Sequence, residues 1–359
     1  MKILVVKLHA LGDLVIHTSA FERIKGGFPD AKITLLTTDW AFPAVKGLPF
    51  FNKVIALPNE LFFGNRLTSA SGLTKLLLRL RNETFDVVIS FHRSKGLNFY
   101  LNTIGKRGSR FYSYSDKDSR YTVKLDETKH SALNACELAD LVIEQVAERN
   151  STTASNEMRY HWNVSEIELN KADEVLGSHG IIPGKFAVIF PGGGANPNAT
   201  APERRWSTEG FAKLATWLQE QANLRVIASG SKNDYDVCAE VSSLSGKSIF
   251  NLAGKTDIRT TAAIIKRSRV VVTNDSAPLH ISAAVGSLTV GIFGPTGAVY
   301  KLPPGDRNVG VSLGLPCSPC YYGAFKGCQF DTIRCMTELT HQKVIDVVDV
   351  LLNRFPELK

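Results

Sequence analysis

Short runs of β-branched and apolar residues alternate with amphipathic stretches along most of the chain. Such alternation is typical of strands that are each followed by a helix covering a parallel sheet, so it predicts an α/β fold. The predicted strands are Lys2–Val6, Ile33–Thr37, Val54–Leu57, Phe85–Ser90, Phe186–Phe190, Arg225–Ala228, Val270–Thr273 and Thr289–Phe293. The predicted helices are Leu14–Lys25, Leu67–Arg81, His130–Glu148, Glu166–Ser178, Thr208–Gln221, Tyr235–Leu244, Arg259–Arg267, Pro278–Val285 and Gln342–Phe355.

A polar passage, Arg149–Glu157, separates two halves that each carry this pattern. The 359 residues suffice for two domains of about 100–200 residues each. We expect a first domain over 1–165, a boundary around 165–183, and a second domain over 183–340 that faces the first across a cleft. The last segment, 341–359, is expected to form a helix that packs back on the first domain.

Composition narrows the class of protein. The chain is 44% hydrophobic and 21% charged, as in ordinary soluble domains, and it has no apolar run of about 18 residues. The apolar start is interrupted by Lys7 and Asp13 before a signal sequence forms, so we expect a cytoplasmic protein. A net charge of +8 favours acidic partners. Since no RNA-binding aromatic motif or basic helix is present, a phosphorylated substrate or an anionic membrane is favoured over nucleic acid.

Two loops that follow predicted strands in the second half carry chemistry suited to anions. Gly192–Gly194 allow backbone amides to approach a phosphate closely, and the nearby Arg204 supplies a guanidinium. Asp234 follows the next strand, where a carboxylate can accept hydrogen bonds from a ribose or can cap the following helix. Both interpretations of Asp234 stay open at this point.

A third loop of this kind follows Val270–Thr273. Asp275, Ser276 and Pro278 occupy the predicted start of a helix, whose free amides form an anion site. His280 lies one turn further on, where it is either packed or part of the site. Three such loops follow the carboxyl ends of strands in one domain, and together they predict a site for a nucleoside diphosphate.

In the first half, the loop after the first strand retains only Gly12 of a dinucleotide-binding Gly-x-Gly-x-x-Gly pattern, so NAD is not expected there. Asp13 stands at the start of the following helix. It is either the N-cap of that helix or a general base that faces the cleft.

Nine short segments with their order along the chain resemble glycosyltransferase family 9, the bacterial lipopolysaccharide heptosyltransferases. These segments are Lys2–Lys7, Leu11–Asp13, His17–Thr18, Phe190–Gly192, Arg204–Trp206, Asn251–Thr256, Thr273–His280, Ala283–Gly286 and Phe293–Thr296. The resemblance implies a GT-B architecture of two Rossmann-like domains. It also implies an inverting transfer of heptose from ADP-heptose to the inner core of lipopolysaccharide.

The resemblance also assigns residues. Asp13 falls on the family's proposed base, and acceptor contacts are implied for Lys7, Gly12, His92 and Arg93. The implied donor-binding residues are Gly192, Gly193, Arg204, Asp234, Asp275, Ser276, Ala277, Pro278 and His280. Arg204 replaces a Lys that is usual in the family, and Ala277 stands where many members have Gly.

The expected partners follow from the same resemblance. They are an ADP-sugar donor and an acidic acceptor of the lipid A and Kdo type, reached by peripheral contact with the cytoplasmic face of the inner membrane. We expect a monomer that requires no cofactor for the reaction.

Two Asp-x-Asp triplets have the pattern with which metal-dependent GT-A enzymes bind a metal ion. Asp116 and Asp118 lie in a polar loop rather than after an apolar strand. Asp234 and Asp236 have a spacing that places their side chains about 200° apart on a helix. We therefore expect no catalytic metal.

Four cysteines near the end of the chain form a C-x2-C-x7-C-x6-C pattern, namely Cys317, Cys320, Cys328 and Cys335. In a cytoplasmic protein such clustering indicates structural zinc or an iron–sulfur cluster. The alternative is a compact loop of packed or disulfide-forming cysteines.

Two other functions remain compatible with the sequence. One is a different GT-B enzyme, such as a nucleotide-sugar 2-epimerase, which needs no separate acceptor. The other is a non-catalytic protein that binds nucleotides or glycans. Comparing the binding of ADP with that of UDP and GDP, and assaying transfer to an acceptor, separates these functions.

Overall fold

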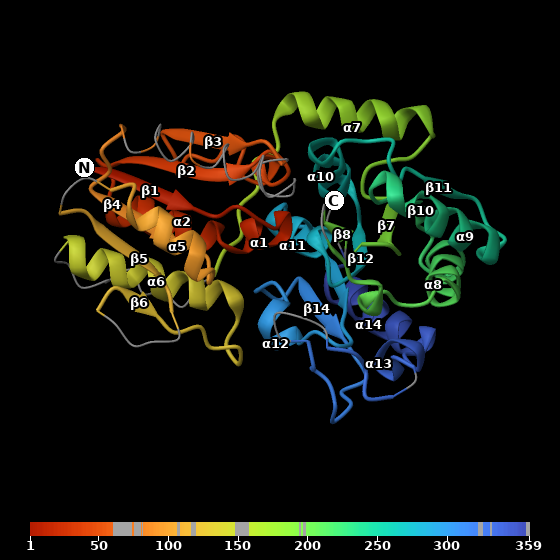
Figure 1. Cartoon of the computed structure of the whole chain (residues 1–359). Coiled ribbons are helices and arrows are strands. Elements are labelled where there is room, and N and C mark those ends of the chain that lie inside the picture. The colour runs from red at the N-terminus through yellow and green to blue at the C-terminus, as the bar shows by residue number, and fades with distance from the viewer. Residues whose placement is uncertain are drawn as a thin grey trace. The chain divides into compact units, whose positions relative to one another are not determined.

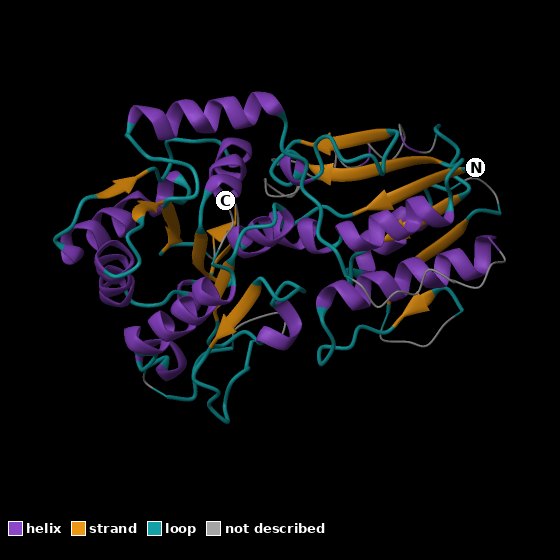
Figure 2. Ribbon diagram, turned by 180° about the vertical axis from the view of Figure 1, so that it is seen from behind, coloured by secondary structure: helices purple, strands orange, loops and turns teal. Residues whose placement is uncertain are grey.

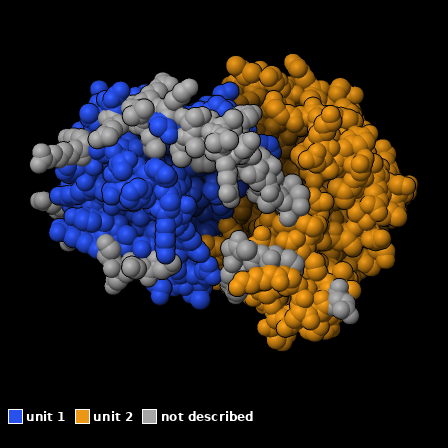
Figure 3. Space-filling view, viewed as in Figure 1, with its two compact units in different colours: residues 1–161 blue, residues 162–359 orange. Residues whose placement is uncertain are grey.

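The structure is a computed structural model, and the chain divides into two compact units, Met1–His161 and Trp162–Lys359 (Figure 3). The residues that it describes are 1–59, 74, 80, 82–105, 108–115, 120–147, 158–193, 195–196, 199–321, 326–330 and 332–356. Within them, no helix is both long enough and apolar enough to span a membrane.

The first unit contains a parallel sheet whose strand order, over the described residues, is β3-β2-β1-β4-β5-β6 (Figure 1). Val6 on β1 is aligned with Leu36 on β2 and with Ser90 on β4, so β1 and β4 end side by side at one edge. The strands are β1 (Lys2–Val6), β2 (Lys32–Thr38), β3 (Lys53–Leu57), β4 (Val87–Ser90), β5 (Arg110–Tyr114) and β6 (Thr122–Val123).

Helices lie over the sheet of the first unit (Figure 2). α2 packs against α6 so closely that a Cβ on Gly27 would lie 2.5 Å from Cγ1 of Ile143. Only glycine at this position allows the two helices to approach so closely. The helices described in this unit are α1 (Leu11–Ile16), α2 (Thr18–Gly27), α5 (Lys95–Asn102), α6 (Ser131–Ala147) and the short 3-10 helix η1 (Phe42–Ala44).

The second unit repeats the same topology, with strand order β11-β10-β7-β12-β13-β14 among its described residues. Numbered within each unit, both sheets follow the order 3-2-1-4-5-6 of a Rossmann fold. The strands are β7 (Phe186–Phe190), β10 (Arg225–Ala228), β11 (Ile249–Asn251), β12 (Val270–Asn274), β13 (Thr289–Ile292) and β14 (Asn308–Val311). A separate antiparallel pair consists of β8 (Ala195–Asn196) and β9 (Ala199–Thr200).

All five residues of β7 are buried, as expected for a strand at the centre of a parallel sheet that is covered on both faces. The helices of this unit are α7 (Glu166–Ser178), α8 (Thr208–Glu220), α9 (Tyr235–Ser245), α10 (Ile258–Arg267), α11 (Ala277–Ala284), α12 (Ala298–Lys301), α13 (Arg334–Thr337) and α14 (His341–Arg354). The 3-10 helices are η2 (Pro202–Arg204) and η3 (Lys232–Asp234).

The predicted α/β fold is confirmed, and every predicted strand is present with small shifts at its ends. The pattern missed β5, β6, β11 and β14, which lie at or near the sheet edges, where strands are short and less apolar. The first predicted helix is interrupted at His17, which separates α1 from α2. The predicted helix Leu67–Arg81 and the pair Asp116 and Asp118 lie largely outside the described residues.

The division between the units falls before the predicted boundary at 165–183, because α7 is part of the second unit. Glu168 and Asp173 on α7 accept hydrogen bonds from Arg259 and Arg267 on α10. These pairs attach the helix to the second sheet.

The last helix, α14, was predicted to pack on the first domain, and the structure corrects this expectation. Arg269 donates a hydrogen bond to the carbonyl of Leu352 over 3.1 Å. The apolar face of the helix packs into the core of its own unit. Its residues in that core are Val344, Ile345, Val348 and Leu351.

We expect Glu168→Gln to lower the free energy of unfolding by about 3 kcal/mol, because it leaves a buried guanidinium without its carboxylate. Arg259 contacts both carboxylate oxygens of Glu168 at 2.8 Å, and both side chains are 10% exposed. Burial opposes ionisation, but the bonds from Arg259 and Ser165 outweigh it and lower the pKa of Glu168 to about 2. Urea unfolding at pH 7 measures the effect.

The same pair predicts a pH dependence. A carboxyl whose pKa is lower in the folded state stabilises the fold above about pH 4.5, and that contribution is lost as the pH falls toward 2. Glu168→Gln should lack this component, whereas Glu174→Gln, a change at an exposed position of the same helix, should retain it. Equal pH profiles for the two variants would contradict the assignment.

Candidate functional site

β7 and β12 are adjacent strands at which the strand order of the second sheet reverses, and ligands of open α/β sheets bind beyond the carboxyl ends at such a point. Asn274, the last residue of β12, holds the loop after β7. Its side-chain amide donates to the carbonyls of Pro191 and Gly192, and each donor–acceptor distance is 3.0 Å. Its oxygen accepts from the backbone N–H of Trp206, also over 3.0 Å. One buried side chain thus joins three loop segments.

The glycine loop is shaped around the carboxylate of Asp234. A Cβ on Gly192 would lie 2.1 Å from Oδ1 of Asp234, and Gly193 has a φ of +91°. Oδ1 accepts from the N–H of Gly193 over 3.1 Å, and Oδ2 accepts from the N–H and hydroxyl of Ser231 over 2.8 and 2.7 Å. Asp234 is therefore the partner of the N-cap Ser231 in the capping box of η3, and it fixes the glycine loop. It is also the N-cap of the following helix α9, but its side chain makes no capping hydrogen bond there. A contact with ribose remains a prediction.

Two consecutive arginines flank the same loop. Nη1 of Arg204 lies 3.3 Å from Oδ2 of Asp275, which is 3% exposed, and its guanidinium lies 5.4 Å from the ring centre of Tyr321. Nε of Arg205 donates to the carbonyl of Gly193 over 2.9 Å. Nε of Arg204 is buried and Nη2 of Arg205 lies 3.8 Å from Oδ1 of Asp234, but both side chains are partly exposed, so each guanidinium can reach an anion at its exposed edge.

The N-terminus of α11 completes this edge of the second sheet. Ser276 is the N-cap with an extended backbone, and Ala277 and Pro278 form the first turn. A Cβ on Gly193 would lie 2.8 Å from Oγ of Ser276, so the glycine loop and the helix N-terminus are neighbours. His280 is 4% exposed within the helix. The predicted donor residues therefore gather at one place, except that Gly194 lies outside the described residues.

This arrangement combines glycine amides, a helix N-terminus and two guanidinium groups. Each of these groups binds anions, and together they suit the adjacent phosphates of a diphosphate. The site therefore has the chemistry of a nucleoside diphosphate pocket.

β1 and β4 are the corresponding neighbours in the first unit, and here titratable side chains gather. Nζ of Lys7 lies 3.8 Å from Oδ2 of Asp13, and Lys7 is 6% exposed. The N-cap of α1 is Ala10, so Asp13 stands in the first turn rather than capping the helix. Its side chain is 36% exposed, which leaves the carboxylate accessible to a substrate hydroxyl. Gly12 is buried beside it in α1.

His92, directly after β4, is fixed by the loop that follows β1. The N–H of Leu8 donates to Nε2 of His92 over 2.9 Å, and the ring of His9 lies 5.1 Å away. Burial, then the charge of Lys7 and the two histidines His9 and His17, lower the pKa of His92 well below 6.5. His92 is therefore neutral at neutral pH and accepts a hydrogen bond at Nε2.

Arg93 follows His92 directly, and its predicted contact with the acceptor stays a prediction. Its half-exposed guanidinium contacts Glu127 at 3.0 Å. It is therefore engaged in a surface ion pair, whose contribution to stability is small.

Sequence reasoning overlooked several residues of these two edges. Arg205 and Asn274 lie inside two of the segments that carry the family resemblance, but the residues that they contact depend on the fold. Tyr160 carried no motif at all. It is buried with its hydroxyl 3.5 Å from Nε2 of His130, and burial, and next the charge of Asp13, raise its pKa well above 10.

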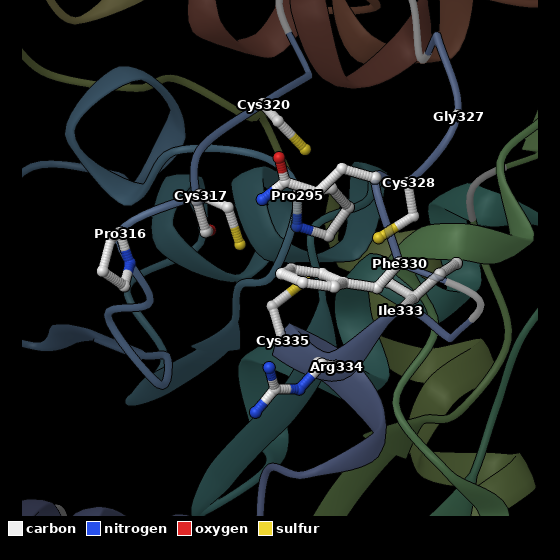
Figure 4. Close-up of a pocket in the computed structure, with 12 residues that line it drawn as sticks. Pro295, Pro316, Cys317, Cys320, Gly327, Cys328, Phe330, Ile333, Arg334 and Cys335 are labelled. Atoms are coloured by element: carbon white, nitrogen blue, oxygen red, sulfur yellow. The ribbon is translucent and has the colours of Figure 1, made fainter.

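The four clustered cysteines are free thiols that line one cavity of about 490 Å³ (Figure 4). Burial, then the other three cysteines, raise the pKa of Cys335 to about 11. Among the described residues, no group of three His, Cys, Asp or Glu side chains is arranged to hold a metal ion as it stands.

Comparison with known proteins adds to this geometry. The chain matches the family "Glycosyltransferase family 9 (heptosyltransferase)" over residues 73–326. It is 26% identical over 358 residues to lipooligosaccharide heptosyltransferase 2 of Campylobacter jejuni, covering 98% of this chain and 99% of that protein.

Two solved structures have the same fold. One is ADP-heptose lps heptosyltransferase II of E. coli, with a TM-score of 0.74, 19% identity, and coverage of 99% of this chain and 100% of that one. The other is a family 9 glycosyl transferase of Veillonella parvula, with a TM-score of 0.78, 19% identity, and coverage of 98% and 97%.

Proposed function

The chain belongs to glycosyltransferase family 9, the heptosyltransferases, and we propose that it transfers a heptose from ADP-heptose to the inner core of lipopolysaccharide with inversion at the sugar. The heptose donor and the lipopolysaccharide acceptor are the ones that the names of its relatives state. One structural observation carries the proposal. The second unit assembles a glycine loop, two arginines and a helix N-terminus at the switch point of its sheet.

The donor is assigned to the second unit. The amides at the start of α11 and the guanidinium groups of Arg204 and Arg205 would bind the diphosphate of ADP-heptose, and the glycine loop, which has no side chains, would let the phosphates approach. These donors also stabilise the charge that develops as ADP leaves, and such preorganised groups often make the largest contribution to catalysis.

The acceptor is assigned to the first unit, where Asp13 acts as the general base. The carboxylate takes the proton of the acceptor hydroxyl while that oxygen forms the bond to C1 of the heptose and the bond from C1 to the ADP oxygen breaks. Lys7 places a positive charge 3.8 Å from the carboxylate. His92 is a weak base, because its pKa is lowered well below 6.5 and its Nε2 already accepts from Leu8, so Asp13 is the group suited to receive the proton.

A donor screen with the purified full chain tests this function. We expect release of ADP, and an acceptor product heavier by one heptose, only when ADP-heptose and a Kdo–lipid A or heptosylated acceptor are both present. UDP- and GDP-sugars should give no product. Isomerisation of a nucleotide sugar without acceptor would indicate an epimerase, and nucleotide binding without turnover would indicate a binding protein. Either result would overturn the proposal.

The acceptor is carried by a lipid, so the enzyme should work at the cytoplasmic face of the inner membrane. The net charge of +8 favours reversible contact with anionic lipids. Sedimentation with vesicles of anionic lipid should deplete the protein from solution at low salt, and vesicles of neutral lipid should not.

Arg204→Gln should weaken ADP binding about tenfold or more, because a charge-assisted contact with phosphate is lost. Isothermal titration with ADP measures this directly. Arg354→Gln removes the same charge from an exposed position on α14 and serves as the control. If both variants bind ADP equally well, Arg204 does not contact the phosphates.

A further inference from the structure

The cysteine cavity, defined here as the space lined by Cys317, Cys320, Cys328 and Cys335, belongs to none of the groups assigned to the transfer reaction. The four side chains come from three places in the chain and surround Pro295 (Figure 4). Cys317 and Cys328 are half-buried, Cys320 is exposed and Cys335 is buried. Four thiols therefore share one polarizable pocket that opens to solvent.

The fold holds the first two cysteines against the end of β13. The backbone N–H groups of Cys320 and Tyr321 both donate to the carbonyl of Pro295 over 2.9 Å. The hydroxyl of Ser318 donates to the carbonyl of Gly294. This part of the loop is thus bound to the sheet by three hydrogen bonds.

The last cysteine reaches the same place on α13. A Cβ on Gly294 would lie 2.2 Å from Sδ of Met336 and 3.2 Å from Sγ of Cys335. The short helix can approach the end of the strand only because residue 294 has no side chain. Two separate backbone devices therefore bring these cysteines to one cavity.

We propose that the four cysteines together bind one soft transition-metal ion, zinc or iron, as thiolates. In binding, four S–H groups release their protons to solvent and four sulfur–metal bonds form, with no change of oxidation state. Thiolate ligation by four cysteines is the usual arrangement of structural zinc and of simple iron sites. As they stand, the four thiols are not arranged to hold an ion, so binding has to draw them together to about 2.3 Å from it.

The alternatives fit the structure less well. All four cysteines are unpaired thiols, so no disulfide accounts for their clustering. Packing alone favours buried cysteines without voids, whereas here a cavity of about 490 Å³ lies between partly exposed thiols.

The site has a consequence for the donor pocket, and this part rests on the proposed function. Tyr321 follows Cys320 directly, and the guanidinium of Arg204 lies over its ring. A metal that fixes Cys320 would fix the ring, and with it the position of Arg204 beside Asp275. The ion would thus act as a structural support for phosphate binding rather than in the chemistry.

Metal analysis of the full chain, produced with zinc and iron both in the medium and purified with and without oxygen, tests the site. We expect about one metal ion per chain in the wild type, and about tenfold less in Cys317→Ser/Cys320→Ser. Cys238→Ala, a buried cysteine outside the cavity, is the control and should keep its metal. The zinc-to-iron ratio and the visible absorption of iron thiolates identify the ion.

Either metal supports the proposal if the double variant loses it. A wild-type protein with less than about 0.1 ion per chain in both preparations, or a double variant that keeps the ion, overturns it. Thiol titration of the unfolded chain that finds the four cysteines oxidised also overturns it.

A second measurement tests the link to Arg204 separately. If the double variant loses its metal but unfolds at the wild-type temperature, the ion is not structural. If ADP then binds about tenfold more weakly, the metal helps to position Arg204. Unchanged ADP binding would refute this link to Arg204 but not the metal site itself. Metal content is measured without nucleotide or heptose. A failure of the proposed transfer reaction would therefore not overturn the metal site, and the absence of metal would not overturn the transfer reaction.

Discussion

Asp13→Asn is expected to lower kcat about 100- to 10,000-fold while the dissociation constant for ADP stays within about twofold of the wild type. The amide has nearly the shape of the carboxylate but cannot take the proton of the acceptor hydroxyl. ADP is assigned to the second unit, so its binding should not depend on this side chain. Steady-state rates with ADP-heptose and isothermal titration with ADP measure the two quantities.

The variant also removes the negative charge that lies 3.8 Å from the buried ammonium of Lys7, so some stability is expected to be lost. A thermal melt separates this loss from the catalytic one. Asp30→Asn, at an exposed position of the same unit, controls for the change in charge. A folded Asp13→Asn enzyme that turns over near the wild-type rate would show that another group is the base.

Gly192→Ala is expected to weaken ADP binding about 100-fold and to lower kcat/KM at least as much. The new Cβ would lie 2.1 Å from Oδ1 of Asp234, far inside van der Waals contact. The carboxylate is 4% exposed and is held by Ser231, so the loop rather than Asp234 has to move. The bond from Gly193 to Asp234 is then lost, and the loop no longer keeps the shape that leaves room for the phosphates beside Ser276 and the two arginines.

Gly177→Ala provides the matched control. Gly177 lies in α7, where an added Cβ meets nothing within 4 Å. The variant should therefore bind ADP as the wild type does, and its alanine should stabilise the helix slightly. Titration with ADP and a thermal melt of both variants complete the test. Wild-type affinity in Gly192→Ala would mean that the glycine loop does not contact the diphosphate.

The two units use one topology for different chemistry. At the switch point of the second sheet, glycines, arginines and a helix N-terminus supply positive charge and amides. At that of the first, Lys7, Asp13 and a neutral His92 supply groups that exchange or accept protons. This division matches the roles of a donor unit and an acceptor unit.

The sequence alone determined the class of fold, because the alternation of apolar runs and amphipathic stretches follows directly from a sheet covered by helices. It also predicted which segments carry the site. Loops at the carboxyl ends of parallel strands meet at one edge whatever the details of packing, so Gly192, Arg204 and Asp275 could be grouped from their places after strands. Asp13 was identified in the same way.

Only the tertiary structure decided which atoms meet. Asp234 could be expected to bind a ribose or to cap the following helix, but its bond to Gly193 depends on two strands that are distant in the sequence and was not predicted. The edge strands and the place of α14 were missed or misjudged because local pattern does not record what an apolar face packs against. Contacts between distant segments are set by the packing of the whole unit, and a single sequence contains no direct record of them.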